Sequence, residues 1–321
     1  MISDNSLSET DLIKYFLSLS ANDASLKVAN GDDAAVFSAG DLQIVISTDS
    51  YIENIHFETS YCSYFSIGFK AIEASGSDIV AMGALPHFFL VALGLPENYS
   101  KVQVQELYSG INASLKRLNA VLIGGDTCLS GQELVLNITA LGTLEAQKRP
   151  LLRSGAQPGD MIAVSGKLGS ARAGFELLKK GISGFEGLKK KFLEPACRVD
   201  LVGSLTELAS SCIDISDGVA SEIRHVCRMS GVGAVIYEEK LPFYSELPRA
   251  AELAGISLND CLLCGGEDYE LLYTISPEKK AEIEGTVIGE ITYQREIIIE
   301  NSSGRRKLTE EGFDHFNRGT T

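Results

Sequence analysis

The sequence predicts an α+β fold made of two α/β domains with mixed sheets. The chain has 321 residues, which exceeds the usual size of a single core, so two domains of roughly 150 residues are expected. Helix-like and strand-like segments alternate in both halves, but without the regular rhythm of a doubly wound sheet. A run of turn residues at 153–160 interrupts the pattern. The predicted domains are therefore residues 1–148 and 149–321.

Apolar periodicity places the elements of the first half. The helices expected there are 6–19, 64–82 and 102–118, and the strands are 42–47, 88–95, 121–123 and 134–141. In the second half the expected strands are 161–165, 232–237 and 269–274. Two strand-to-helix junctions stand out there, at 166–170 and at 212–218. Strand ends are where α/β folds usually meet their ligands.

Composition excludes several classes of function. The formal net charge is −15, which argues against a nucleic-acid or anionic membrane surface, because both require clustered Lys and Arg. A polyphosphate ligand would therefore need a metal. No apolar run approaches about 20 residues, and the start has no basic segment followed by an apolar core; we expect a soluble, cytoplasmic protein. Seven irregularly spaced cysteines fit reduced thiols rather than a disulfide framework.

Two adjacent aspartates, Asp32 and Asp33, stand between Gly31 and a short apolar run. Aspartate is disfavoured in strands, and neighbouring like charges repel. Something must compensate them, and few basic residues lie nearby in the sequence. We expect a metal rather than lysine to do so, with Asp32 facing it and Asp33 accepting hydrogen bonds that hold the loop.

More carboxylates occupy special places in the first half. Asp49 and Asp126 are predicted just beyond strands, and Asp78 shares a helix face with small apolar residues. Each alone can be a turn or cap residue or a buried, hydrogen-bonded acid. Together, carboxylates that converge without cations favour Mg²⁺, a hard ion that prefers oxygen ligands.

The segment from Asp214 to Gly218 adds two carboxylates and a hydroxyl at a predicted helix start. Ser216 or Asp217 could simply cap the helix, although that leaves Asp214 unexplained. A helix N-terminus can also hold a phosphate. Two other signals are weaker: Gly166-Lys167 lacks the spacing of a phosphate-binding P-loop, and Cys261 and Cys264 form a lone CxxC pair for which core thiols are expected before zinc.

Several motifs occur in an order that resembles the thiamine-monophosphate kinase family. These are Gly31-Asp32-Asp33-Ala34-Ala35-Val36, Ser47-Thr48-Asp49, Ile55-His56-Phe57, Ser77-Asp78, Gly124-Gly125-Asp126, Arg153-Ser154-Gly155, Asp214-Ile215-Ser216-Asp217-Gly218, Gly265-Gly266-Glu267-Asp268-Tyr269 and Gly312-Phe313-Asp314-His315-Phe316. The resemblance covers nearly the whole chain. Aminoimidazole-ribonucleotide synthetase, selenophosphate synthetase and the hydrogenase-maturation dehydratase share the acidic scheme, so it is the combination of motifs that distinguishes the kinase.

The resemblance implies ATP-dependent transfer of the γ-phosphoryl group to thiamine monophosphate by in-line displacement, without a phosphoenzyme. It further implies a homodimer whose N-terminal domains share a β-barrel, and an active site in the cleft between the two domains. Mg²⁺ ions are implied, and K⁺ dependence stays open. Neither nucleic acid nor membrane is an expected partner.

The resemblance also implies roles for the residues of this sequence that match the family motifs. The matching magnesium positions are Asp32, Ser47, Thr48, Asp49, Asp78, Asp126, Asp214 and Asp217. Nucleotide contacts match Tyr108, Gly125, Asp126, Arg153 and Ser216, and the acceptor side matches His56, Glu267 and Phe313. Asp49, Asp214 and Arg153 are expected to stabilise charge. No acid or base is assigned, since a phosphate acceptor is largely ionised near neutral pH.

The acidic motifs also allow rival functions. Selenophosphate synthetase would require a reactive cysteine near the start, but the first one is Cys62. The hydrogenase-maturation enzyme would require a C-terminal cysteine, whereas this chain ends in Arg318-Gly319-Thr320-Thr321. From a different class, the acids could belong to a non-catalytic cation-binding module.

Overall fold

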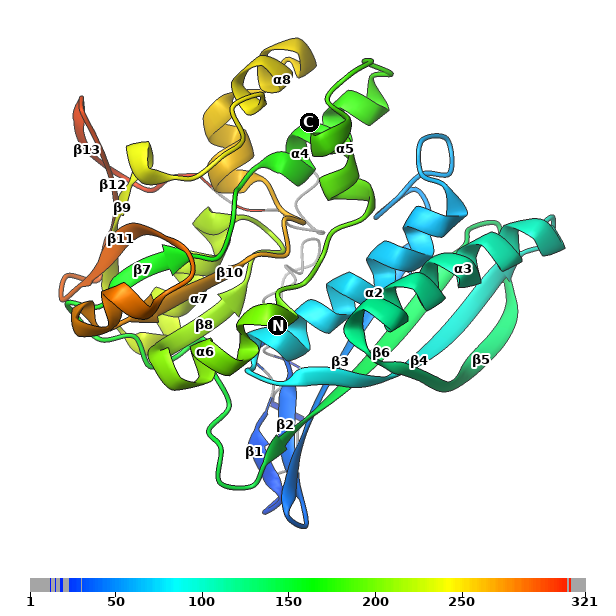
Figure 1. Ribbon diagram of the computed structural model, residues 1–321, viewed down its shortest axis with the longest axis horizontal. Coiled ribbons are helices and arrows are strands. Elements are labelled where there is room, and N and C mark those ends of the chain that lie inside the picture. The colour runs from blue at the N-terminus through cyan, green and yellow to red at the C-terminus, as the bar shows by residue number, and fades with distance from the viewer. Residues whose placement is uncertain are drawn as a thin grey trace, which may run out of the picture.

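The computed structural model describes residues 12, 15, 18–19, 23–29, 31–310 and 312. The described part contains two mixed sheets, one from each half of the chain, with helices packed against them (Figure 1). The expected opening helix at 6–19 lies largely outside the described residues. No helix among those described is long and apolar enough to cross a membrane.

The first sheet has six strands in the order β1-β2-β3-β6-β4-β5. Their bounds are β1 Leu26–Val28, β2 Ala35–Ala39, β3 Leu42–Ile52, β4 Leu85–Pro96, β5 Val121–Gly131 and β6 Val135–Glu145. Only β4 and β5 pair in parallel. Burial alternates along β6, because one face of the sheet packs against helices. The sheet is open within one chain, with β1 and β5 at its edges.

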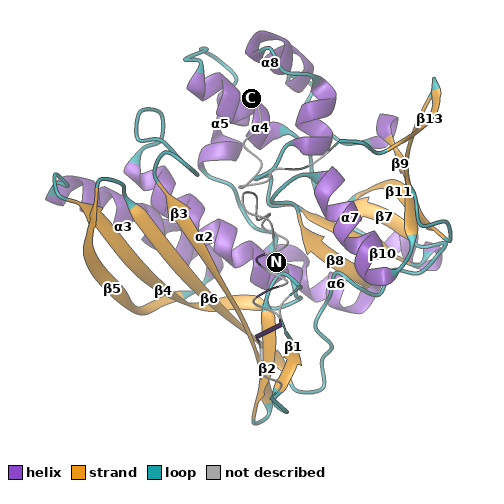
Figure 2. Cartoon of the chain, turned by 180° about the vertical axis from the view of Figure 1, so that it is seen from behind, coloured by secondary structure: helices purple, strands orange, loops and turns teal. Residues whose placement is uncertain are grey.

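Two long helices, α2 (Tyr64–Ala81) and α3 (Lys101–Leu118), cover one face of this sheet (Figure 2). Ser63 caps the first, since its hydroxyl accepts a hydrogen bond from the backbone N–H of Ser66. The two helices approach closely at Gly110, where a Cβ atom would lie 1.9 Å from the carbonyl oxygen of Phe65. Glycine is required there because the backbones are in contact.

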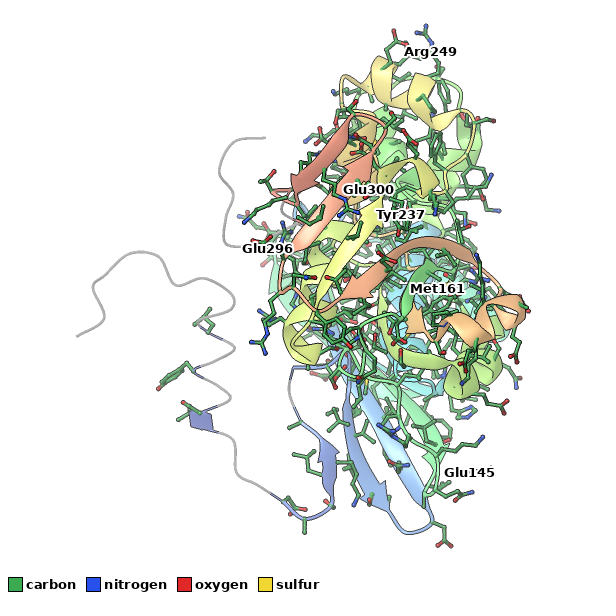
Figure 3. The ribbon with its side chains drawn as sticks, turned by 90° about the vertical axis from the view of Figure 1, so that its left-hand side faces the viewer. Glu145, Met161, Tyr237, Arg249, Glu296 and Glu300 are labelled. Atoms are coloured by element: carbon green, nitrogen blue, oxygen red, sulfur yellow. The ribbon has the colours of Figure 1, made fainter. Side chains whose placement is uncertain are left out.

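The second sheet has seven strands in the order β13-β12-β9-β11-β7-β10-β8. Its strands are β7 Met161–Val164, β8 Ala209–Asp214, β9 Gly233–Tyr237, β10 Leu271–Ile275, β11 Thr286–Thr292, β12 Ile297–Asn301 and β13 Gly304–Lys307. Figure 3 shows Glu145, the last residue of β6 in the first sheet, and Met161, the first residue of β7 in the second. The same view shows Tyr237 and Glu300 on the second sheet, with Glu296 just before β12.

Short helices connect and cover the strands of the second half. They are α4 Ser170–Lys179, α5 Glu186–Leu193, α6 Val202–Leu208, α7 Val219–Ser230 and α8 Leu247–Ala254, with 3-10 segments at Val199–Leu201, Glu238–Lys240 and Pro277–Glu282 and a π-helical turn at Asp260–Cys264. Burial on α7 follows helical spacing, with Ala220, Ile223 and Cys227 facing the core.

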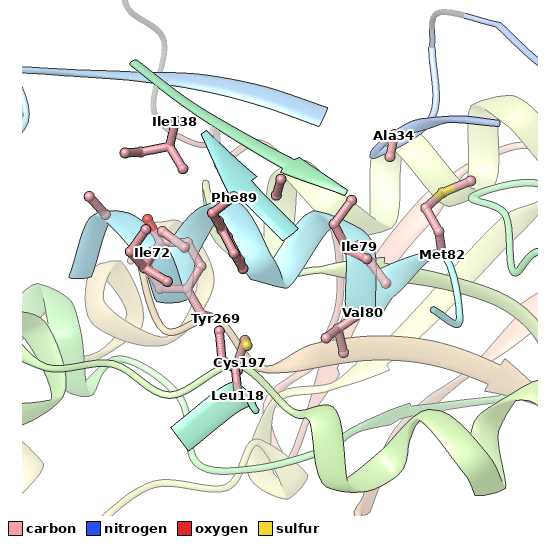
Figure 4. Packing of buried hydrophobic residues seen from close by; sticks show 14 of the residues in the cluster. Ala34, Ile72, Ile79, Val80, Met82, Phe89, Leu118, Ile138, Cys197 and Tyr269 are labelled. Carbon is pink, nitrogen blue, oxygen red and sulfur yellow. The ribbon is translucent and has the colours of Figure 1, made fainter. Parts of the chain in front are cut away.

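Helix α2 joins the two halves. It is buried on nearly all sides, which its many Ala, Ser and Gly residues permit. Phe89 and Ile138 of the first sheet lie on one side of it, and Cys197 and Tyr269 of the second half lie on the other (Figure 4). These residues belong to one hydrophobic cluster that spans both halves.

The expected helices at 64–82 and 102–118 are confirmed to within about one residue. Several strand boundaries were wrong, and two of these errors concern the acids. Strand β3 continues to Ile52 in unbroken register with β6, and β5 continues to Gly131, so Asp49 and Asp126 lie inside strands and not beyond them. A polar residue is tolerated in β5 because this edge strand is mostly exposed.

Candidate active site

A cavity of about 600 Å³ lies where β3 and the loop after it meet α4 and two loops of the second half. It is lined by Thr48, Asp49, Ser50, Tyr51, Asn54, Ile55, His56, Phe57, Glu58, Tyr61, Arg172, Phe175, Lys179, Phe192, Ser216, Asp217, Cys264, Gly266, Glu267 and Tyr269. Six of these are residues that the sequence motifs predict: Thr48, Asp49, His56, Ser216, Asp217 and Glu267. Segments more than 150 residues apart thus form one cavity.

A buried group of carboxylates lies beside this cavity. The hydroxyl of Ser47 donates to Asp78 Oδ2 at 2.5 Å, and that of Ser77 donates to Asp214 Oδ2 at 2.7 Å. Burial raises the pKa of Asp78 well above its usual range, and the negative charges of Asp49, Asp214 and Asp33 raise it further. The four acids therefore act on one another, although they come from four separate segments of the chain.

Burial dominates the electrostatics of the other members of this group. It raises the pKa of Asp214 to about 6, with the hydroxyl of Ser77 partly opposing the shift. It also raises the pKa of Asp49. Carboxylates that are buried and repel one another destabilise a fold unless a cation accompanies them. The arrangement therefore favours a bound cation.

The donor set fits Mg²⁺. The carboxylates and hydroxyls of this buried group offer only oxygen atoms as ligands, and oxygen ligands suit a hard divalent ion. For the buried oxygen Asp33 Oδ2, no hydrogen-bond partner is found among the described residues. Within the described residues, no three or more Asp, Glu, His or Cys side chains form a ready metal cage. Mg²⁺ commonly keeps several waters and takes only one or two protein carboxylates, so this looser arrangement is compatible with it.

Arg153 supplies the positive charge nearest to the adjacent aspartates. Its Nη2 lies 2.6 Å from Asp33 Oδ1 and its Nε lies 2.9 Å from the same oxygen, while its backbone N–H donates to Asp32 Oδ1 at 2.7 Å. The expected role of Asp33 as a hydrogen-bond acceptor is confirmed, and its donor is the guanidinium of Arg153. Burial raises the pKa of Asp33, and the Arg153 guanidinium opposes this shift.

Two loops of the second half are joined through their backbones. The N–H of Glu267 donates to the carbonyl of Ser216, and the N–H of Tyr269 donates to that of Ile215. A Cβ atom on Gly266 would lie 2.2 Å from the Ser216 carbonyl oxygen, so only glycine allows this approach. Ser216 and Asp217 therefore reach the cavity together with Glu267.

Asp268 has a structural role in this motif. It is buried, and its carboxylate accepts hydrogen bonds from the backbone N–H groups of Gly169 and Ala171 at the start of α4. It thereby caps a helix from a distant part of the chain. Glu222 has a similar role on the other loop, because its Oε1 accepts from the N–H of Asp217 at 2.9 Å.

The motifs did not reveal one wall of the cavity. Helix α4 contributes Arg172, Phe175 and Lys179, and the aromatic rings of Tyr61 and Phe192 complete this wall. The residues on α4 recur at spacings of three and four, which places them on one helix face. In the sequence, this stripe of basic and aromatic residues is the pattern that could have predicted the α4 wall.

His56 lies in the cavity with a defined ring orientation. Its Nδ1 accepts a hydrogen bond from the backbone N–H of Ile52 at 3.0 Å, and its ring meets that of Tyr51 edge to face. A neutral His56 therefore carries its proton on Nε2.

Four predicted nucleotide contacts do not line this cavity, namely Tyr108, Gly125, Asp126 and Arg153. Tyr108 is on α3, whereas Gly125 and Asp126 are on the exposed edge strand β5. A Cβ atom on Gly125 would lie 1.8 Å from the carbonyl oxygen of Val91, so close pairing with β4 accounts for this glycine. Phe313, predicted on the acceptor side, lies outside the described residues.

Comparison with known proteins places the chain among relatives that it matches over nearly their full length. Residues 31–144 match the model of the AIR synthase related protein, N-terminal domain. The thiamine-monophosphate kinase of Bacillus subtilis is 32% identical over 97% of this chain and 100% of its own length. That of Aquifex aeolicus is 33% identical over 89% and 92%.

Solved structures agree with these relatives. AaThiL complexed with AMPPCP and TMP superimposes with a TM-score of 0.88 at 31% identity, covering 98% of this chain and 100% of the other. Thiamine monophosphate kinase from Stenotrophomonas maltophilia K279a gives a TM-score of 0.74 at 30% identity, covering 92% and 98%. The chain belongs to the thiamine-monophosphate kinase family.

Proposed function

We propose that the protein transfers the γ-phosphoryl group of ATP to thiamine monophosphate, forming thiamine diphosphate and ADP. The observation that carries the proposal is the buried carboxylate group beside a cavity of about 600 Å³. The family relatives bear the name of this activity, and AaThiL was solved with AMPPCP and TMP. Phosphoryl transfer depends mainly on alignment and charge neutralisation, which such a site can provide.

The chain's own residues would hold the phosphates through Mg²⁺. Asp32, Asp49, Asp78, Asp126, Asp214 and Asp217, with the hydroxyls of Ser47 and Thr48, are the proposed magnesium ligands, and K⁺ dependence stays open. When bound, Mg²⁺ would neutralise phosphate charge and bridge phosphate oxygens to these carboxylates. Ser47 and Ser77 orient Asp78 and Asp214 by donating hydrogen bonds to them.

The acceptor would occupy the part of the cavity lined by His56, Glu267 and the α4 wall. The thiazolium ring of thiamine is a cation, so it favours a carboxylate or an aromatic face, such as those of Glu267 and Phe175. Phe313 is proposed for the same side. The phosphate of the acceptor is an anion, so it would face the two basic side chains of this wall, Arg172 and Lys179.

The proposed nucleotide contacts are Tyr108, Gly125, Asp126, Arg153 and Ser216. Arg153 also holds the Asp33 carboxylate in place. We also propose a homodimer in which the six-stranded sheets of the two copies together close into a shared barrel. Exposed apolar side chains on the edge strand β5, among them Val121, Ile123 and Leu129, support this assembly. The proposed domains are 1–148 and 149–321, and use of ATP is consistent with action in the cytoplasm.

The direct test is incubation with Mg²⁺, ATP and thiamine monophosphate, followed by chromatography for thiamine diphosphate and ADP. We expect equal amounts of both products. Absence of product above an enzyme-free control, with ATP and acceptor well above micromolar levels, would refute the proposed function.

Thermal unfolding should separate this kinase from a module that merely binds cations. Mg²⁺ alone should stabilise the protein, since it neutralises the acidic group. Mg²⁺ with a non-hydrolysable ATP analogue should add about 2–3 kcal/mol at hundredfold excess over its Kd. Chelation with EDTA should remove both effects. A melting temperature that responds to Mg²⁺ but not to the nucleotide would favour the cation-binding module.

Replacement of Arg172 by glutamine should impair recognition of the acceptor phosphate. A charge-assisted hydrogen bond is lost, so the Kd for thiamine monophosphate should rise about tenfold, whereas that for thiamine, which lacks the phosphate, should change little. Titration calorimetry measures both. Glu176→Gln is the matched control, because it removes the ion-pair partner 3.1 Å from Arg172 and keeps the cation. Equal losses for both ligands would contradict this role.

A further inference from the structure

Lys70 is a buried cation that none of the proposed catalytic steps uses. It lies on α2, and its side chain is only 8% exposed. Its Nζ lies 2.7 Å from Glu267 Oε1 and 3.7 Å from the centre of the Phe192 ring. Among the described residues, no hydrogen-bond acceptor is found for this ammonium beyond that ion pair.

Burial of an ammonium with so few partners is costly. Desolvation of a charge is repaid only by a well-placed counter-charge and by further hydrogen bonds. A methionine or leucine would fill the same space without that cost. Both groups that Lys70 contacts, Glu267 and Phe192, line the cavity. The lysine therefore connects α2 to two parts of the cavity wall that come from distant segments.

The Glu267 position is held in two ways. Its backbone has φ of 64°, a left-handed conformation that non-glycine residues rarely adopt, and its N–H donates to Ser216. These contacts fix the backbone but not the side chain. The carboxylate is 32% exposed, and without a partner it would be free to rotate into solvent. Lys70 supplies that partner.

We propose that Lys70 is a positioning residue for the acceptor. With its ammonium over the face of Phe192, it holds one oxygen of Glu267 and presents the other carboxylate oxygen to the cationic ring system of thiamine monophosphate. This inference rests on the proposed function, because it takes Glu267 to contact that acceptor. It does not concern the nucleotide.

The test is titration calorimetry of thiamine monophosphate against the full chain without ATP, repeated with a non-hydrolysable ATP analogue as ligand. Lys70→Met should raise the Kd for thiamine monophosphate about tenfold and leave that for the analogue within about twofold. Lys70→Arg should recover most of the affinity, since it keeps the charge. Glu267→Gln should weaken acceptor binding as well.

The double variant Lys70→Met with Glu267→Gln is decisive. If Lys70 acts through Glu267, the double variant should bind the acceptor about as weakly as Glu267→Gln alone. Fully additive losses, or unchanged acceptor binding in Lys70→Met, would overturn the inference.

Ser114→Ala controls for loss of stability. Ser114 is buried and donates to Glu73, one turn along α2 from Lys70 and outside the cavity lining. Loss of the Ser114 hydroxyl should lower the melting temperature without changing the Kd for thiamine monophosphate or for the ATP analogue. The wild type provides the other reference: if it neither binds nor phosphorylates thiamine monophosphate, the proposed function fails. Normal wild-type behaviour with an unaffected Lys70→Met variant would refute only the role of Lys70.

Discussion

Replacing Asp49 by asparagine is expected to lower turnover by about three orders of magnitude while the fold is retained. Asn has the same shape, but it cannot bring a negative charge to a metal or to the transferred group. The side chain lies in the cavity wall and acts electrostatically on Asp78. Steady-state assays of thiamine diphosphate formation measure the loss.

Stability should respond to this substitution in the opposite direction. Removal of one charge relieves repulsion among buried carboxylates, so the metal-free variant should unfold at a temperature no lower than that of the wild type. Asp41→Asn is the matched control, because Asp41 is exposed in the turn between β2 and β3. Wild-type turnover in the Asp49 variant would exclude Asp49 from the magnesium site.

Replacing Arg153 by methionine is expected to affect both stability and activity. The guanidinium is the ion-pair partner of Asp33, whose side chain is 1% exposed. Loss of one partner of a buried pair leaves an uncompensated carboxylate, which should lower the free energy of unfolding by about 3 kcal/mol. The substitution also removes the cation that is expected to stabilise charge on the nucleotide side, so turnover should fall as well. The backbone N–H that donates to Asp32 is retained.

Urea unfolding of two variants tests this explanation. Arg153→Met should shift the midpoint downward, and addition of Asp33→Asn should restore much of the loss, because the lone charge is then removed. Turnover should not recover in the double variant. If the second substitution destabilises the protein further, Arg153 does not act by compensating Asp33.

Local patterns predicted the elements that carry the site. Helical spacing placed α2 and α3, and with them Asp78 on a face of small residues. The strand ends were less accessible to this reasoning. Polar Thr48, Asp49 and Ser50 looked like the end of β3, but pairing with β6 continues through them. Cross-strand pairing is a long-range interaction that a sequence window does not contain.

Several residues of the site could also be predicted from the sequence. Six predicted residues line one cavity, and Asp78 and Asp214 lie beside it in mutual electrostatic contact with Asp49. The basic and aromatic wall on α4 was missed, although its spacing was visible, because a charged helix face usually points to solvent. Whether such a face meets solvent or a cavity depends on what packs opposite it.

The sequence by itself determined the alternation of helices and strands, the acidic motifs and the family, because these depend on residue type and spacing along the chain. Only the tertiary structure decided which charges meet. Arg153 reaches Asp33 across 120 positions, and Lys70 reaches Glu267 between the two halves. Such pairs depend on how α2 packs between the two sheets, and no local propensity encodes that packing.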